Sequence, residues 1–397
     1  MSTTPAKQRI GLFGFGVVGQ GLYDVLHRTP GLQAEVSRIC VKDRFKDRPL
    51  PASSFTFHKE DILTDPHINV VVELIDDAEA AFDIVSTALR NGKSVVTANK
   101  RLVATRLQEL LDIQRETGSS LLYEASTCGS IPIIRNLEEY YDNDMLSRVE
   151  GIVNGTTNYI LTALHEPSSG GYASALAQAQ KLGFAESDPT LDVEAFDAAF
   201  KTTIIAAHAF GVVVSPLQIV RRGITSVTPF DISIAQQQLR TIKLLSRVQL
   251  HGSGLSLLAL PALTQNTSPL AGVRNEVNAV RLTAAFSDAQ LLVGKGAGGG
   301  PTASAVLSDI AALRYGYRYE YKKLGQASPP VVNHDVEVAI YVRGTNDQIT
   351  SIPFSIVEVD HRSSSGRYVI GHVQLDALHT SPAFLDPETF IAILPED

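Results

Sequence analysis

The side chains best suited to chemistry in this sequence gather between Gly183 and Lys201. A polar stretch containing Glu186 is followed by Asp197 and Lys201, which are four positions apart and share one face if the segment is helical. An Asp–Lys pair at this spacing is most often a surface salt bridge. A lysine whose pKa is lowered by burial or by another cation can instead exchange a proton near neutral pH. The segment therefore offers either a solvated helix face or an acid–base centre.

A second segment has the spacing of a dinucleotide-binding turn. The residues that fit G-x-G-x-x-G are, in order, Gly14, Phe15, Gly16, Val17, Val18 and Gly19. The first glycine permits a tight turn, the second lets the backbone approach a pyrophosphate, and the third permits close packing of helix on strand. The phosphates would meet free N–H groups at the start of the helix. A purely structural turn fits the surrounding strand and helix patterns less well.

The choice between NAD and NADP stays open in the sequence. The second expected strand ends near Cys40-Val41-Lys42-Asp43-Arg44, where an acidic residue is expected after such a turn. Asp43 could hold the ribose hydroxyls of NAD. Lys42 or Arg44 could instead neutralise the 2′-phosphate of NADP.

The first third of the chain alternates strand-like runs with stretches of helical length. The expected strands are Arg9–Phe13, Ser37–Val41, Val70–Leu74, Ser94–Thr97 and Leu121–Tyr123. The expected helices include Leu22–Leu26, Ala78–Arg90 and Leu102–Gln114. This alternation indicates βαβ units and a parallel sheet.

The pattern changes near Ser147. Longer helical patterns follow, and then short strands, which indicates a separate α+β unit. The expected helices are Tyr172–Leu182, Val193–Phe210, Ile232–Leu245 and, after a glycine-rich stretch, Thr302–Leu313. The expected strands are Arg247–Leu250 and Val280–Phe286. Beyond a linker at Gln326–Pro330 the tail is strand-rich, with Val336–Val342, Ile352–Val359, Tyr368–Gln374 and Phe390–Leu394.

Composition excludes several classes of protein. The 397 residues are 44% hydrophobic and 19% charged, as in soluble globular proteins with two or three domains. A formal net charge of -8 argues against nucleic acid or an anionic membrane surface as a partner. Cys40 and Cys128 are too few for a disulfide framework and lack metal-ligand spacing. Since we find neither a signal peptide nor an apolar segment of membrane-spanning length, we expect a cytoplasmic protein.

Five segments besides the glycine turn resemble homoserine dehydrogenase. Together with the glycine turn they cover the chain from about residue 9 to residue 315, and they occur in the order found in the family. They are Val95–Lys100 (VVTANK), Glu124–Pro132 (EASTCGSIP), Gly151–Ile160 (GIVNGTTNYI), Gly183–Lys201 (GFAESDPTLDVEAFDAAFK) and Gly294–Ile310 (GKGAGGGPTASAVLSDI). Any one of them could arise by chance, but the ordered set is a specific match.

The resemblance implies interconversion of L-homoserine and L-aspartate 4-semialdehyde with NAD or NADP, on the route to threonine and methionine. Lys201 matches the acid/base lysine, Asp197 would orient it, and Lys100 would stabilise the developing oxyanion, although the two lysines could exchange roles. The implied substrate ligands are Glu186, Asp192, Asp197, Thr156 and Gly155. The implied cofactor ligands, besides the glycine turn and Lys42 or Asp43, are Lys100, Gly183 and Gly298.

The resemblance also implies a sodium site. Glu124 and the backbone carbonyls of Thr127, Gly129 and Ile131 match the positions that hold a monovalent cation in the family. Oxygen ligands suit a hard cation of this kind. A buried glutamate that caps a turn is the alternative.

The predicted fold is α/β, with a Rossmann-type parallel sheet domain, an inserted α+β catalytic and dimerisation domain, and a small strand-rich C-terminal module. We expect a nucleotide domain at residues 1–146, completed by residues 300–325, and a catalytic domain at residues 147–299. The small module would comprise residues 326–397. The family implies a homodimer or a larger homo-oligomer, with catalysis in a cleft between the first two domains.

Three features depart from the family. Asp76-Asp77 stand where Gly-Gly is common and would place negative charge near the nicotinamide entrance. The loop Ser126–Ser130 carries Thr and Cys at positions that are usually smaller or apolar. The tail beyond Gln326 shows no pattern typical of an ACT-type regulatory domain, so the sequence does not support feedback inhibition by threonine.

Two other functions fit parts of the sequence. Cys128 could be the nucleophile of an acylating semialdehyde dehydrogenase, but no histidine lies between His67 and His165 to activate it. A lone cysteine is more often a packing residue. A dinucleotide-binding sensor without catalysis would have lost its reactive residues, whereas Lys100 and Lys201 are both present.

Overall fold

The computed structural model describes residues 7–142, 145–166, 170–364 and 366–395 and divides the chain into two compact units. Each unit combines an earlier and a later stretch of the chain. The first comprises Met1–Asp142 and Lys295–Lys322. The second comprises Asn143–Gly294 and Lys323–Asp397.

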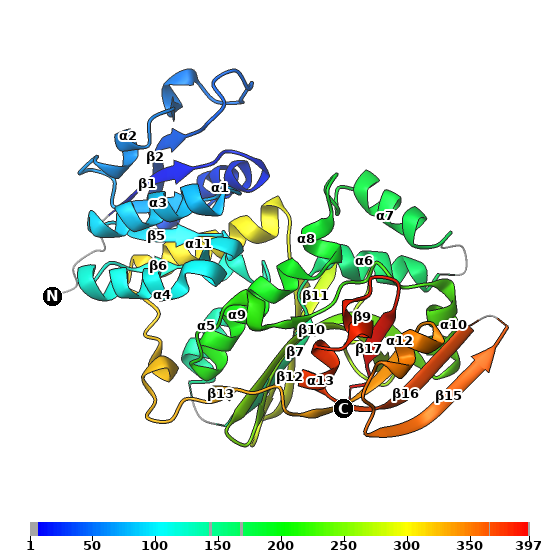
Figure 1. Ribbon diagram of the computed structural model, residues 1–397. Helices are drawn as coiled ribbons and strands as arrows, with labels where there is room; N and C mark the ends of the chain where they lie inside the picture. Colours follow the sequence, from blue (N-terminus) through cyan, green and yellow to red (C-terminus); the bar gives the residue numbers. More distant parts are fainter. Residues whose placement is uncertain (1–6, 143–144, 167–169, 365, 396–397) are drawn as a thin grey trace. The chain divides into compact units, whose positions relative to one another are not determined.

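The first unit is built on a parallel sheet with the strand order β3-β2-β1-β4-β5-β6 (Figure 1). This is the order of a doubly wound dinucleotide-binding fold, and the direction of winding reverses between β1 and β4. The strands are β1 Gln8–Phe13, β2 Ala34–Cys40, β3 Phe55–Thr56, β4 Val70–Glu73, β5 Ser94–Thr97 and β6 Leu121–Leu122. The helices are α1 Val17–Arg28, α2 Glu60–Leu63, α3 Ala78–Arg90, α4 Lys100–Thr117, α5 Ile133–Arg135 and α11 Gly299–Leu313.

Local sequence explains where these elements begin and end. β4 is buried along its whole length, as expected for a central parallel strand covered on both faces. The Asp77 carboxylate accepts hydrogen bonds from the first N–H groups of α3, so this unusual acidic residue is a helix cap. Asn99 caps α4 in the same way, and Gly118 ends that helix in the left-handed region with φ 69°.

The second unit is built on a large mixed sheet with the order β12-β11-β7-β9-β10-β17-β14-β16-β15, and β8 and β13 also pair with β10. Its earlier strands are β7 Leu146–Ile152, β8 Val220–Arg221, β9 Arg240–His251, β10 Gly254–Gln265, β11 Val277–Ala284 and β12 Asp288–Lys295. Its helices in this stretch are α6 Gly155–Leu164, α7 Tyr172–Lys181, α8 Thr190–Val193, α9 Phe196–Phe210 and α10 Pro229–Gln237. Within the described part of the chain, no helix is both long and apolar enough to cross a membrane.

The prediction of a single helix over Ile232–Leu245 is wrong beyond Gln237. α10 ends at Gln237, Leu239 turns the chain with φ 56°, and β9 begins at Arg240. Residues 242–248 of β9 are buried without interruption. A strand covered on both faces has no two-residue period, so its apolar run cannot be distinguished from a buried helix by pattern alone.

The last part of the chain continues the same sheet. It contributes β13 Val331–Val332, β14 Glu337–Arg343, α12 Asn346–Thr350, β15 Ile356–Ser363, β16 Gly366–Gln374, α13 Leu375–His379, α14 Pro382–Leu385 and β17 Phe390–Ile393. From β14 to β17 this is a ferredoxin-like βαββαβ arrangement in which β17 and β16 flank β14. The sequence predicted β14, β15, β16 and β17, but it predicted neither β13 nor these short helices.

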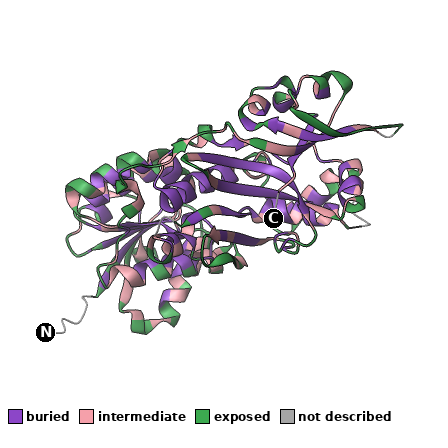
Figure 2. Ribbon diagram, turned by 90° about the horizontal axis from the view of Figure 1, so that it is seen from below, coloured by how far each residue is buried: buried purple, intermediate pink, exposed green. Residues whose placement is uncertain are grey.

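One hydrophobic core joins the early and late parts of the second unit. β17 pairs in parallel with β10, with Ala262 opposite Ile393. Leu258 and Leu260 of β10 belong to the same buried cluster as Ile340 of β14, and buried residues run along these strands in Figure 2. Residues 326–397, which the sequence analysis assigns to a module of their own, are therefore grouped here with residues 143–294.

Candidate active site

α9 carries a buried ion pair formed by Asp197 and Lys201. Nζ of Lys201 lies 2.9 Å from Oδ2 of Asp197 and donates a hydrogen bond of 2.6 Å to the carbonyl of Val153. Lys201 is 6% exposed and Asp197 1% exposed. These values exclude the interpretation of the pair as a solvated surface salt bridge. Burying both charges is unfavourable unless they are matched, so their geometry is tightly constrained.

Asn154 connects this ion pair to Asp192. Its Nδ2 donates to Oδ1 of Asp192 at 2.7 Å and to Oδ2 of Asp197 at 2.8 Å. Its Oδ1 accepts the N–H of Thr157 at 2.8 Å and thereby caps α6. Asn154 is not among the predicted site residues, although an Asn before Gly-Thr-Thr is a typical helix N-cap and could have been found from that signal.

The first turn of α6 holds Gly155 and Thr156 beside the loop that carries Glu186. The Thr156 hydroxyl donates to the carbonyl of Phe184 at 2.6 Å, so its oxygen remains able to accept. A Cβ on Gly155 would stand 2.7 Å from the carbonyl oxygen of Glu276, which explains the glycine. Glu186 is exposed in the loop.

Gly183 begins the same loop. Its φ of 78° lies in the left-handed region, where glycine is the least strained residue. It ends the turn after α7, and its N–H bonds to the carbonyl of Gln180. Gly183 is placed in the second unit, so its predicted contact with a dinucleotide stays a prediction.

The glycine turn of the first unit has the geometry that a dinucleotide needs. Gly14 has φ 91°, and a Cβ there would lie 2.6 Å from the carbonyl oxygen of Leu74. A Cβ on Gly19 would lie 2.5 Å from the carbonyl oxygen of Gly14, so only glycine allows this approach of helix to turn. Gly16 precedes α1 without a side-chain cap, and a Cβ there would meet no atom within 4 Å. The turn therefore presents N–H groups beside open space.

The remaining residues of the turn are divided between core and surface. Phe15 is buried, and its ring packs edge-on against Tyr23 at 6.0 Å and Phe55 at 5.4 Å between centroids. Val17 is 74% exposed, and Val18 is partly buried. Of these three side chains, that of Val17 is the most accessible to a ligand at the surface of the turn.

The start of α11 adjoins the turn. Gly298 is the N-cap of α11 and has φ 110°, which favours glycine. A Cβ on the next residue, Gly299, would stand 2.9 Å from Cγ1 of Val17. Two helix starts, those of α1 and α11, thus lie together in the first unit.

Lys42 and Asp43 follow β2, at the carboxyl edge of the sheet. Both are exposed. Oδ1 of Asp43 accepts the N–H of Phe45 at 2.8 Å, and Arg48 donates to the carbonyl of Asp43 at 2.7 Å. The arrangement leaves both the acidic and the basic side chain at the surface, so the choice between NAD and NADP is still open.

Lys100 is the first residue of α4, after its cap Asn99. Asn99 also donates from Nδ2 to the carbonyl of Ile75 at 3.0 Å, which ties the start of α4 to the segment after β4. Lys100 is partly buried there. It lies in the first unit, whereas Lys201 lies in the second.

Glu73, the last residue of β4, is a further candidate. It is fully buried, accepts the Thr97 hydroxyl at 2.5 Å and accepts the N–H of Ile75 at 2.6 Å. Burial raises the pKa of Glu73 to about 7. The sequence signal was a charged residue that ends a run of valines, at the strand edge where such folds bind ligands.

Glu124 lies in a buried cluster of opposite charges. Its two carboxylate oxygens accept the N–H groups of Ile134 and Arg135, each at 2.9 Å. Arg135 also pairs with Asp309 at 3.2 Å, and the N–H of Glu124 donates to Asp309 at 2.9 Å. Burial raises the pKa of Glu124 to about 8, with Asp309 adding to the shift, and burial raises that of Asp309 to about 7.

A sodium ion fits this cluster electrostatically. In the described part of the chain Arg135 forms its ion pair with Asp309 and meets the Glu124 carboxyl group through its backbone N–H, so an added cation would stabilise the ionised form of Glu124. Of the carbonyl ligands expected from the sequence, that of Ile131 already accepts the N–H of Ile133 at 2.8 Å, and Gly129 has φ 53°. Carbonyl oxygens have two lone pairs, so Thr127, Gly129 and Ile131 retain the capacity to coordinate.

Cys128 is fully buried. A catalytic thiolate must be reached by its substrate, and a thiol in such a position is usually a small packing group. The burial of Cys128 therefore favours the packing interpretation.

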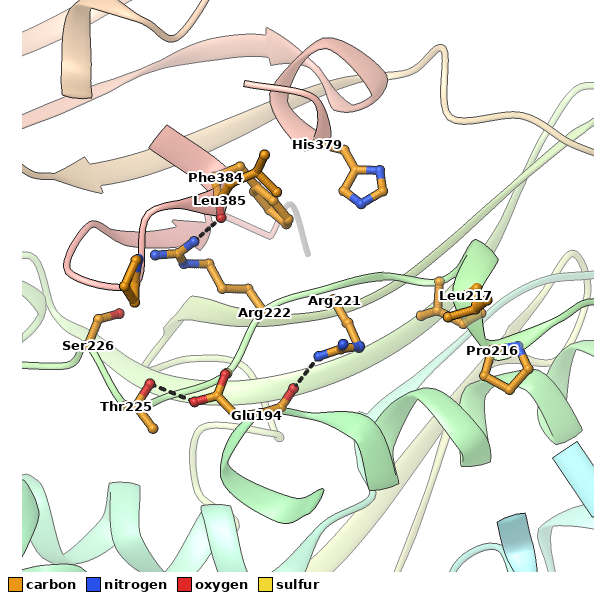
Figure 3. A pocket seen from close by; sticks show the side chains of 13 residues that line it. Glu194, Pro216, Leu217, Arg221, Arg222, Thr225, Ser226, His379, Phe384 and Leu385 are labelled. Carbon is orange, nitrogen blue, oxygen red and sulfur yellow. Dashed lines mark hydrogen bonds between the residues drawn. The ribbon is translucent and has the colours of Figure 1, made fainter. Parts of the chain in front are cut away.

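A cavity of about 370 Å³ lies beside the turn before α9 (Figure 3). The Glu194 carboxylate accepts a hydrogen bond of 3.0 Å from the Thr225 hydroxyl, and the backbone carbonyl of Glu194 accepts one of 2.9 Å from the Arg221 guanidinium. Arg222 donates to the carbonyl of Phe384 and to two further carbonyls near α14. The described residues that line this cavity include none of the predicted site residues. Arg221 and Glu194 therefore hold the turn that leads into α9, and Arg222 holds the segment around α14.

Comparisons with known proteins agree with this architecture. Residues 14–124 match the model of the homoserine dehydrogenase NAD-binding domain, and residues 132–311 match that of homoserine dehydrogenase. A homoserine dehydrogenase of Bacillus subtilis is 36% identical over 402 residues, which cover 94% of this chain and 92% of that protein. One from Corynebacterium glutamicum is 39% identical and covers 76% of this chain and 70% of its own length.

A solved structure extends the similarity to three dimensions. The homoserine dehydrogenase from Thiobacillus denitrificans superposes with a TM-score of 0.85 at 29% identity and covers 98% of both chains. Sequence, fold and the dinucleotide turn thus agree. The chain belongs to the homoserine dehydrogenase family of NAD(P)-dependent oxidoreductases.

Proposed function

We propose that this chain reduces L-aspartate 4-semialdehyde to L-homoserine, and that Lys201 supplies the proton. The observation that carries the proposal is the buried Lys201–Asp197 ion pair. A hydride from the nicotinamide would form the new C–H bond at the aldehyde carbon, and the carbonyl π electrons would move to oxygen. The Lys201 ammonium, oriented by Asp197, would protonate that oxygen. In the reverse direction neutral Lys201 would take the proton back.

Lys100 is proposed to stabilise the negative charge that develops on the substrate oxygen. As the first residue of α4 it adds its charge to the positive end of the helix dipole. Preorganised positive charge of this kind favours an oxyanion in the transition state. The two lysines could exchange these roles, and each is therefore tested separately below.

The substrate's two charged groups, its carboxylate and its ammonium, suit the residues around α6. The N–H groups of Gly155 and Thr156 at the helix start favour the substrate carboxylate. The Glu186 carboxylate, the Asp192 carboxylate and the Thr156 oxygen favour the ammonium. Asp197, the remaining predicted substrate ligand, would act through its ion pair with Lys201.

The dinucleotide is proposed to lie on the Gly14–Gly19 turn, with its pyrophosphate at the N-terminus of α1. Gly298, at the start of α11, would border it. Asp43 would favour NAD and Lys42 would favour NADP. The dinucleotide, when bound, supplies or accepts the hydride.

We also propose a sodium ion held by Glu124 and the carbonyls of Thr127, Gly129 and Ile131. The buried carboxyl group of Glu124 supports this proposal, because a bound cation would stabilise its charged form. The ion would fix the segment that follows β6 and would take no part in hydride transfer.

The family further suggests a homodimer in the cytoplasm that serves threonine and methionine synthesis. The dimer is proposed to form through the second unit. Light scattering of the purified protein would determine its mass, and cell fractionation would determine its location.

The central test is homoserine oxidation followed with NAD and with NADP, in sodium chloride and in choline chloride. We expect Lys201→Met to lower kcat by about 10²- to 10⁴-fold, because it removes the proton-transfer group. Since this change leaves Asp197 buried without a partner, the double variant Lys201→Met/Asp197→Asn is included to restore charge balance. Lys100→Met is run beside them.

Lys181→Met is the matched control, because Lys181 is exposed on α7. It should keep wild-type turnover. Near-normal turnover of the folded Lys201 variants, with dinucleotide binding intact, would contradict the assigned role. Absence of wild-type turnover with either cofactor would contradict the proposed reaction.

A further inference from the structure

Among the residues that the structure describes, the buried Lys243 of β9 has no ion-pair partner. Lys243 is 1% exposed, and its Nζ donates to Oδ1 of Asn158 at 3.0 Å and to the carbonyl of Val273. Both acceptors are neutral, whereas an ammonium has three N–H donors. Burial lowers the pKa of Lys243 to about 8, with Arg274 adding to the shift. A buried ammonium held only by neutral groups is unfavourable, and a nearby negative charge would stabilise it.

A cavity of about 270 Å³ borders this lysine. Arg240 and Arg274 also line it. The carboxylate among its described lining residues, Glu166, is already paired with Arg274. Lys243 is held by two neutral acceptors, and the one carboxylate of the described lining is already paired with Arg274, so Lys243 leaves the cavity with a surplus of positive charge.

His165 lines the cavity but does not add to this charge. Its Nε2 accepts the N–H of Ile242 at 3.1 Å, so this nitrogen carries no proton. Burial, together with the positive charges of Lys243 and Arg274, lowers the pKa of His165 to about 4. The imidazole is neutral at pH 7 and can donate only from Nδ1.

The rest of the lining is largely polar. It includes the side chains of Thr162, Gln236, Thr241 and Asn266. A water occupies about 30 Å³ of liquid, so the space holds a small anion together with several waters. Apolar ligands would gain little here.

We propose that this cavity binds a small divalent oxyanion, for which inorganic phosphate is the probe. The Lys243 ammonium and the Arg240 and Arg274 guanidinium groups would donate charge-assisted hydrogen bonds to its oxygens. Because Lys243 also donates to Asn158 in the first turns of α6, an ion bound here would help to hold that helix in place. Binding of the ion does not depend on the proposed reaction.

The test is a calorimetric titration of the full chain with phosphate at pH 7, in the presence of saturating NAD so that the glycine turn is occupied. We expect one phosphate site in the wild type and at least about tenfold weaker binding in Lys243→Met, since a hydrogen bond to a charged group contributes about 1.5–3 kcal/mol. Arg274→Gln should weaken binding as well. This second change lies at the surface and keeps the variant foldable if Lys243→Met does not fold.

Arg362→Gln is the matched control. Like Arg274, Arg362 is exposed and paired with a carboxylate, that of Asp360, but it lies on β15 and does not line the cavity. It should bind phosphate as the wild type does. No phosphate binding by the NAD-saturated wild type, or equal affinity in Arg274→Gln and Arg362→Gln, would overturn the proposal. Acetate binding as tight as that of phosphate would overturn the assignment to a divalent anion.

Discussion

Glu73 shows how strongly burial can change a single side chain. It ends a strand of valines, has no exposed surface, and keeps its carboxyl group between the Thr97 hydroxyl and the N–H of Ile75. Its pKa of about 7 means that the folded protein holds this proton at a pH at which an unfolded chain has released it. The proton held by Glu73 therefore links stability to pH near neutrality.

We predict that Glu73→Gln flattens the pH dependence of unfolding near pH 7. Because the folded-state pKa lies above the ordinary value of 4.5, the folded state binds more protons and the free energy of unfolding falls as pH rises from about 4.5 to 7. Glutamine carries no charge and removes this contribution. Thermal unfolding between pH 5 and 8.5 measures it.

Glu124 and Asp309 titrate in the same window in both proteins, so the difference between wild type and variant isolates Glu73. Parallel pH profiles for the two proteins would show that Glu73 is not the source.

At the scale of elements, the glycines of the turn have two different functions. One is needed for the backbone to fold, and another is needed for the ligand to approach. Gly14 is required by the backbone, since it has φ 91° and no room for a Cβ beside Leu74. Gly16 is not required by the fold, because a Cβ there would meet no atom. Its small size instead leaves space for the ligand to approach.

Gly14→Ala should therefore mainly lower the stability of the fold, whereas Gly16→Ala should mainly weaken dinucleotide binding. We expect Gly14→Ala to lower the free energy of unfolding by about 1–3 kcal/mol through backbone strain and the contact with Leu74. Gly16→Ala should change it by less than about 0.5 kcal/mol but weaken dinucleotide binding at least severalfold. Denaturant unfolding and a fluorescence titration with NAD and NADP measure the two properties. A large loss of stability in Gly16→Ala would show that the fold, and not the ligand, requires this glycine.

The same scale shows what the sequence could and could not predict. The longer strands and helices of the first unit follow from their alternation, and the glycine turn follows from its spacing. The two-residue strand β3 and the short helices α2 and α5 were not predicted. The strand β9 could not be separated from a helix, because residues 242–248 are buried on both faces and lose the two-residue period. The short helices α12 and α13 are too brief to show a helical period.

The candidate site was predictable where side-chain chemistry is conspicuous. Lys201 and Asp197 could be selected from their spacing, but their burial could not, because it depends on strands far away in the sequence. Asn154 was missed because its side chain serves two purposes at once, helix capping and contact with Asp192 and Asp197. Only the folded chain places those carboxylates within its reach.

At the scale of the whole molecule, the C-terminal strands are part of the second unit's core. β10 pairs with β17, and Ile340 belongs to the buried cluster that includes Leu258 and Leu260. An independently folded C-terminal domain would have a hydrophobic core of its own. The shared cluster favours cooperative unfolding of both parts.

We predict that Ile340→Ala destabilises the entire second unit by about 2–5 kcal/mol, because it leaves a cavity in the shared core. Hydrogen exchange should accelerate in β9 and β10 as well as in β14. Ile356→Ala is the matched control, since Ile356 is 53% exposed on β15 and should have little effect. Faster exchange confined to residues 337–393 would instead support an independent C-terminal domain.

Each unit is built from two separated stretches of chain, and this has a consequence for biosynthesis. When Asp142 leaves the ribosome, every strand of the first sheet has been made, but α11, which packs on α1, has not. At about 5–20 residues per second, α11 follows on the order of ten seconds later. β17 emerges later still to complete the second sheet. Two unfinished domains must therefore coexist on the nascent chain, and translation itself is the period of greatest exposure to aggregation and to chaperones.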